Sequence, residues 1–193
     1  CTVVVIETAP ASKIERMRAL GATLIPVPYE VAWQTLEERT FPGIEGTFVH
    51  PFDDHDFIAG HATIGLEILE DAPDTAAVIA SIGGGGLVTG VGSVMRARSP
   101  RVKVWGAEPE TAAPLALSLA KGSAQRFEEW QPSFVDGAGG QSVFPRMWQR
   151  MQPVVDGSIV VGLDDVRRAM RLLAEKARVI AEGAGALAVA AAL

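Results

Sequence analysis

The sequence is poor in the residues that carry redox and metal chemistry. Cys1 is the only cysteine, so no disulfide can form within the chain, and a reducing, cytoplasmic setting is favoured. The histidines number three and lack the spacing of a zinc site. They are His50, His55 and His61. The acidic residues 53, 54 and 56 beside His55 are expected to form a solvated first helical turn, so we expect no metal site.

Lysine is also scarce. Each of the four lysines has a position typical of the protein surface, at a helix end, on a charged helix face or alternating with strand valines. They are Lys13, Lys103, Lys121 and Lys176. None of them is predicted to be the desolvated amine that covalent catalysis on a carbonyl group requires.

Positive charge is in deficit, and two kinds of partner are therefore disfavoured. The net charge is −6, which argues against a nucleic-acid groove and an anionic membrane surface. Residues 75–95 carry no charge and are numerous enough to cross a bilayer. Six of them are glycines and four are Ser or Thr, so we interpret the segment as a strand, a turn and a helix. No basic and apolar secretory signal opens the chain.

The most informative segment lies within this uncharged stretch. Val78, Ile79 and Ile82 are typical of a buried strand, and four glycines, residues 83–86, follow directly. Glycine lets a ligand approach the main chain, and the helix that follows would present free N–H groups to an anion. The alternative is a flexible loop. The spacing fits neither the dinucleotide fingerprint nor the P-loop, so it indicates an anion site and leaves the ligand open.

Strands and helices are expected to alternate along the chain, which predicts an α/β fold with a doubly wound, mostly parallel sheet. Strands are expected at 2–6, 23–27, 47–49, 76–82, 102–107 and 159–161. Helices are expected at 12–20, 29–39, up to 69, 87–98, 112–120, 141–151, 164–178 and from 182. Residues 12–15 read as a capping box that starts the first helix. The chain opens in an apolar strand and stops inside a helix, so we expect the fold to be incomplete at both ends.

Several blocks of sequence occur in the same order as in one known enzyme group. They are residues 50–54, 58–69, 81–87, 106–110, 136–137 and 182–186. In these blocks the chain resembles the pyridoxal-phosphate-dependent serine/threonine dehydratases, the group of threonine ammonia-lyase and serine racemase. The resemblance covers essentially the whole chain and implies the tryptophan-synthase-β-like fold, fold type II.

The resemblance also implies roles for particular residues. The cofactor would be pyridoxal 5′-phosphate, its phosphate bound by main-chain N–H groups of the turn, and two further residues would lie near its ring. The implied phosphate-binding residues are Gly83, Gly84, Gly85, Gly86 and Leu87, and the two near the ring are Gly137 and Glu182. The alternative for Glu182 is an acid that merely begins a helix. The lysine that moves the α-proton in this group matches no residue of this chain, so we assign no catalytic residue.

The implied domains are residues 1–51, the remainder of a small domain, and residues 52–193, an incomplete larger domain that binds the cofactor phosphate. The implied reaction converts L-threonine or L-serine into a 2-oxo acid and ammonia, in a homo-oligomer that acts on a small amino acid. Serine racemase, a β-replacement enzyme and a non-catalytic ligand-binding remnant remain alternatives.

Two departures from the group stand out. The group has Gln-Gly where this chain has His61 and Ala62, so substrate geometry could differ. Some members bind a divalent cation through the residue that matches Glu108 and a later acid, which is Pro114 here, so no metal is carried over. The alternative for Glu108 is an acid at the surface end of a strand.

Overall fold

The structure is a computed structural model that describes residues 1–193. The chain forms two compact units, Cys1–His50 and Pro51–Leu193, and each is described by itself.

The first unit contains one parallel strand pair and two helices. Its elements are β1 (Thr2–Ile6), α1 (Ala11–Ala19), β2 (Thr23–Val27) and α2 (Tyr29–Glu38). β1 pairs with β2 in register from Thr2↔Thr23 to Ile6↔Val27. Gly21 has a φ of +82°, as expected for a glycine that ends a helix.

Two expectations for this unit are wrong. The capping box at residues 12–15 does not exist, because α1 starts one residue earlier with Pro10 as its N-cap and no side-chain cap. The carbonyl oxygen of Pro10 instead accepts from the amides of Lys13 and Ile14. Residues 47–49 pair with no other segment and therefore form no strand, although their β-branched and aromatic side chains suit one.

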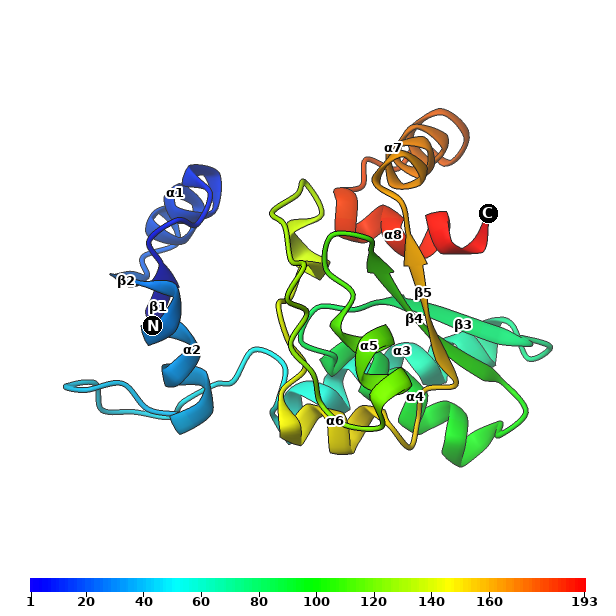
Figure 1. Cartoon of the computed structure of the whole chain (residues 1–193), viewed down its shortest axis with the longest axis horizontal. Helices are drawn as coiled ribbons and strands as arrows, with labels where there is room; N and C mark the ends of the chain where they lie inside the picture. Colours follow the sequence, from blue (N-terminus) through cyan, green and yellow to red (C-terminus); the bar gives the residue numbers. More distant parts are fainter. The chain divides into compact units, whose positions relative to one another are not determined.

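The second unit is a three-stranded parallel sheet with helices on both faces (Figure 1). The strands are β3 (Ala77–Ser81), β4 (Lys103–Pro109) and β5 (Gly157–Val161), in the order β3-β4-β5. The helices are α3 (His55–Asp71), α4 (Gly86–Arg98), α5 (Pro114–Lys121), α6 (Pro145–Met151), α7 (Leu163–Leu172) and α8 (Gly183–Ala192). All strand pairs are parallel, as predicted for an α/β fold of this type.

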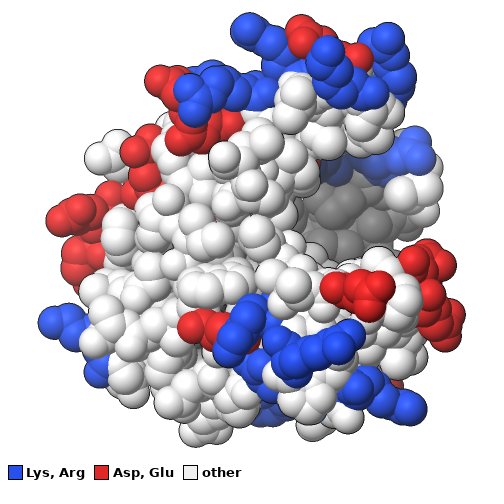
Figure 2. All heavy atoms as spheres, turned by 90° about the vertical axis from the view of Figure 1, so that its right-hand side faces the viewer, with Lys and Arg blue, Asp and Glu red and all other residues white.

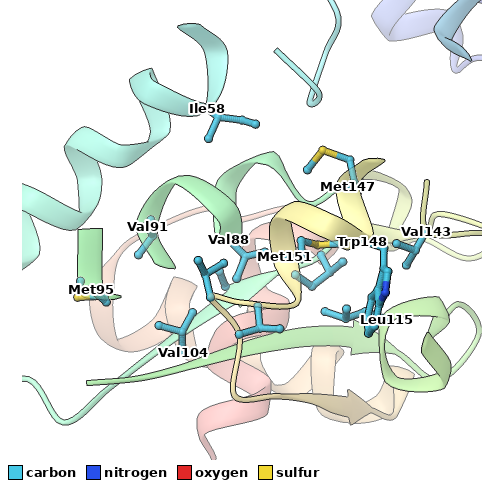
Figure 3. Packing of buried hydrophobic residues seen from close by; sticks show 14 of the residues in the cluster. Ile58, Val88, Val91, Met95, Val104, Leu115, Val143, Met147, Trp148 and Met151 are labelled. Carbon is cyan, nitrogen blue, oxygen red and sulfur yellow. The ribbon is translucent and has the colours of Figure 1, made fainter. Parts of the chain in front are cut away.

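Two hydrophobic clusters cover the two faces of this sheet. One contains Val104 of β4 and side chains of α3, α4, α5 and α6, with Met95, Leu115 and Met147 fully buried (Figure 3). The other contains Ala107 of β4 and side chains of β5, α7 and α8. Burial on both faces explains why these strands are nearly free of charge.

Helix boundaries differ from expectation where proline or a wide turn intervenes. The helix expected from residue 141 begins only at Pro145, because Phe144 is extended and proline suits the first helical position. The helix expected to reach residue 178 changes at Leu173 into a π-helical turn, Leu173–Ala177, which Arg178 closes in the left-handed conformation. No helix has both the length and the apolar character that crossing a membrane requires.

Candidate functional site

The turn between β3 and α4 carries a row of unpaired backbone donors. β3 ends at Ser81, and Gly85, with a φ of +88°, is the N-cap of α4. The amide of Ile82 donates to Ala107, and the next amide that donates within the chain is that of Thr89, to Gly85. The N–H groups of residues 83–88 therefore have no backbone acceptor within the chain, and they lie at the positive end of the helix dipole, where an anion is favoured.

Close packing explains why this turn requires glycine. A Cβ at Gly84 would overlap the ring of Phe52, and one at Gly85 would overlap the sulfur of Met151. A Cβ at Gly83 would lie 2.7 Å from the carbonyl oxygen of Gly137. Only Gly85 also needs its positive φ, so the other glycines serve close approach.

The turn borders a cavity of about 600 Å³. Residues from β3, α3, α4 and α8 line it together with the glycine turn, and none of its lining residues is Lys, Arg, Asp or Glu. On the face drawn in Figure 2 the molecule is hollowed, with Lys or Arg atoms above the hollow, Asp or Glu atoms below it and uncharged residues beside it. A cavity of this size suits a small cofactor, and its uncharged wall leaves the backbone donors as the main source of positive potential.

Most of the sequence-predicted site residues meet at this cavity. Residues 83–87 and Gly137 line it. Glu182 is exposed and does not line it, but its Oε1 lies 3.1 Å from where a Cβ on Gly137 would stand. Glu182 is also the N-cap of α8 without a side-chain cap bond, so its carboxylate is not used to start that helix.

Ser81 joins two walls of the cavity. Its hydroxyl donates a 2.7 Å hydrogen bond to the carbonyl oxygen of Ala184, in the first turn of α8. Ser81, Ala184 and Gly185 all line the cavity. Sequence reasoning assigned them no role, since a serine inside a strand pattern carries no local signal of its partner.

The four lysines lie away from this cavity. All four are exposed, and Lys103 forms a 3.0 Å ion pair with Asp156. None of them lines the cavity, as their sequence positions indicated.

The acidic turn before α3 is only partly solvated. Asp54 is the N-cap of α3 and accepts from the amides of Asp56 and Phe57. Asp53, in contrast, is buried and forms ion pairs of 3.2 Å with Arg146 and 3.0 Å with Arg150. The expectation of a solvated turn is therefore wrong for Asp53, whose partners on α6 lie far along the chain.

Glu108 is not a surface acid. It is fully buried, and its carboxylate accepts from the amides of Leu115 and Ala116 and from the hydroxyl of Ser158, at 2.7 to 2.8 Å. Burial raises the pKa of Glu108 above its usual value, although these hydrogen bonds act in the opposite direction. The carboxylate thus binds the N-terminus of α5. The alternative that Glu108 is an acid at the surface end of a strand is therefore wrong.

His61 is the one histidine among the residues that line the cavity. It lies on α3, packs edge-on against Phe57 with ring centroids 4.9 Å apart, and lines the cavity with Ile64 and Ile68. No group of three or more His, Cys, Asp and Glu side chains lies close enough together to hold a metal ion.

Comparison with known proteins relates the whole chain to one family. The family described as "Pyridoxal-phosphate dependent enzyme" matches residues 1–193. The chain is 39% identical to the L-threonine ammonia-lyase of Thermotoga maritima and 33% identical to that of Geobacter sulfurreducens. Each match covers all of this chain and 48% of the relative, so the chain spans about half the length of these relatives.

Solved structures agree with the sequence relatives. The processed form of threonine deaminase isoform 2 from Solanum lycopersicum matches with a TM-score of 0.86 at 33% identity, over 99% of this chain and 56% of that one. Serine racemase from Dictyostelium discoideum matches with a TM-score of 0.83 at 30% identity, over 99% of this chain and 61% of that one.

Proposed function

Because the chain belongs to the pyridoxal-phosphate dependent enzyme family, we propose that its protein is an ammonia-lyase that converts L-threonine or L-serine to a 2-oxo acid and ammonia. The fold is that of the fold type II enzymes, which include threonine deaminase and serine racemase. The observation that carries the proposal is the row of unpaired amides, residues 83–88, at the mouth of an uncharged cavity. The relatives named L-threonine ammonia-lyase support threonine as the substrate.

The residues of the site fit pyridoxal phosphate, the family's cofactor. In this proposal the amides of Gly83, Gly84, Gly85, Gly86 and Leu87 bind the phosphate, and Gly137 and Glu182 lie beside the ring. The amides of these five lining residues have no backbone acceptor within the chain, which suits a dianion with three terminal oxygens, and a side chain at Gly83 would collide with Gly137. When bound, the cofactor stabilises the negative charge that develops at the α-carbon of the substrate.

The other residues of the cavity act by shape and exclusion. The apolar side chains of Ile64, Ile68 and Leu87 restrict water in the cavity, which strengthens the electrostatic interactions inside it. The imidazole of His61 is the one ring in the lining with nitrogens that can form hydrogen bonds, so we assign it contact with the polar part of the substrate. The chain's lysines take no part, since all of them are exposed.

The proposal extends to the domains and to the setting. Unit Cys1–His50 is assigned to a small domain, and unit Pro51–Leu193 to a larger domain that binds the cofactor phosphate. A cytoplasmic location is supported by the single cysteine. We also propose that the full-length protein forms a homo-oligomer, and sedimentation analysis would test this.

The test is a product assay with removal and return of the cofactor. Full-length protein is expected to convert L-threonine to equal amounts of 2-oxobutanoate and ammonia. Removal of pyridoxal phosphate by hydroxylamine and dialysis should abolish product formation. Pyridoxal phosphate should restore it, whereas pyridoxal, which lacks the phosphate, should not.

The second candidate is serine racemase, favoured by the match to the Dictyostelium enzyme at 30% identity. If the full-length protein converts L-serine mainly to D-serine, it is a serine racemase and the lyase assignment is wrong. Failure to bind pyridoxal phosphate at all would instead favour a ligand-binding remnant without activity.

A further inference from the structure

The glycine turn is packed against two side chains from different elements, Phe52, which also lines the cavity, and Met151, which does not. The ring of Phe52 covers Gly84, and the carbonyl oxygen of Phe52 would lie 2.9 Å from a Cβ on Gly86. The thioether of Met151, the last residue of α6, covers Gly85. These two contacts leave the turn little freedom to shift.

An ion-pair cluster joins the residues next to these two side chains. Asp53 follows Phe52 and Arg150 precedes Met151, and the Asp53 carboxylate lies 3.0 Å from Nε of Arg150. Arg146, one helical turn earlier on α6, lies 3.2 Å from the other carboxylate oxygen. We refer to Asp53, Arg146 and Arg150 as the Asp53 cluster.

Burial makes this cluster a stronger connection than a surface ion pair. The Asp53 side chain is 7% exposed and that of Arg150 is 21% exposed, so water screens their interaction only weakly. Phe52 also packs against Phe144, just before α6, with ring centroids 5.3 Å apart. The loop before α3 is thus connected to α6 and its N-cap by two ion pairs and one aromatic contact.

From this arrangement we infer that the Asp53 cluster is a positioning device for the phosphate-binding turn. By holding Phe52 and Met151 against the glycines, it keeps the amides of residues 83–88 pointed into the cavity before any ligand arrives. Such preorganisation lowers the ordering cost of binding. The inference rests on the proposed function, in which this turn binds the cofactor phosphate.

The first test compares two ligands that differ only in the phosphate. In full-length protein freed of cofactor, Asp53→Asn should weaken the binding of pyridoxal phosphate by about tenfold. Binding of pyridoxal should be weakened much less, because it has no phosphate for the turn to bind. Equilibrium dialysis measures both dissociation constants. Equal weakening of both, or of neither, would overturn the inference.

The second test follows the turn without any cofactor. The amide of Thr89 donates to Gly85 in the first turn of α4, and that of Ser99 donates to Met95 at the helix's other end. In Asp53→Asn, hydrogen exchange at Thr89 should accelerate while exchange at Ser99 stays as in wild type. A parallel rise at both ends would show general loosening of α4 and contradict the inference. This result stands even if wild-type protein binds no pyridoxal phosphate, in which case only the proposed function fails.

Matched variants separate positioning from folding. Asp56→Asn removes a nearby exposed carboxylate that forms no ion pair, and should alter neither measurement. Arg150→Gln should reproduce the effect of Asp53→Asn, and Arg150→Lys, which retains the charge, should recover most of the affinity. If Asp53→Asn does not fold, Arg146→Gln takes its place, because the Arg146 side chain is 60% exposed and its replacement should disturb folding less. If Arg146→Gln and Arg150→Gln both bind pyridoxal phosphate and pyridoxal with the same ratio of dissociation constants as wild type, the inference is refuted.

Discussion

Single glycines contribute to the site in different ways. Gly85 combines a φ of +88° with contact to Met151, so a larger residue would be strained twice. Gly60, in the middle of α3, has ordinary helical geometry, and a Cβ there would meet nothing within 4 Å. Two glycine-to-alanine changes should therefore have opposite effects on stability.

Gly85→Ala should lower the free energy of unfolding by about 1–3 kcal/mol and weaken pyridoxal phosphate binding, because backbone strain and overlap with Met151 add up. Gly60→Ala should raise the free energy of unfolding by about 0.5–1 kcal/mol, since alanine favours a helix. Urea denaturation of full-length protein measures both. A Gly85→Ala variant as stable as wild type would contradict the geometry assigned to the turn.

Among the elements, α4, β4 and the start of β5 depend on one carboxylate. Asp156 accepts from the amide of Val104 at 2.8 Å, from Arg96 at 2.6 Å and from Lys103 at 3.0 Å. Burial by itself would raise the pKa of Asp156, but these hydrogen bonds and the charge of Arg96 outweigh it and lower the pKa to about 2. The ionised form therefore stabilises the folded state.

The sign of the pH dependence follows. Because the pKa of Asp156 is lower in the folded protein than its ordinary value of 3.8, its stabilisation is present above about pH 4 and is lost as the pH falls toward 2. Asp156→Asn should remove this part of the acid dependence and cost about 1 kcal/mol at neutral pH, a figure reduced for solvent screening. Asp164→Asn, at a side chain that is 91% exposed, is the control and should change little. Identical acid unfolding of wild type and Asp156→Asn would refute the assignment.

The chain divides into two units, and the first of them contains an exposed segment near its end. Residues 42–47 between α2 and α3 are all exposed and belong to no helix or strand. The first unit contains only residues 1–50, too few for a large core, whereas the second contains both hydrophobic clusters. The two units should therefore differ in resistance to proteolysis.

Limited proteolysis of the 193-residue chain should cut first within residues 39–49 and leave a resistant fragment that begins near Pro51. Mass spectrometry of the early fragments identifies the cut. A first cut within α4 or β4 would show that the second unit is the less stable one.

Local patterns predicted much of the architecture. The alternation of strands and helices, the parallel pairing and the turn at residues 83–86 follow from β-branched runs, helical periodicity and glycine. The predicted phosphate-binding residues and Gly137 line one cavity, although their binding role is still to be tested. Expectations failed where a residue's environment depended on distant chain, as for residues 47–49, which lack a partner strand, and for Glu108, which is buried under α5.

By itself, the sequence determined that a buried strand meets a glycine turn at the start of a helix, because covalent geometry and local hydrophobicity act over a few residues. Only the tertiary structure decided which side chains pack against that turn. Asp53 and Arg150 are nearly a hundred positions apart, and Phe52 and Met151, which lie on different segments, both contact the glycines. Contacts of that kind depend on how separate elements share one core, and no short pattern in the chain records them.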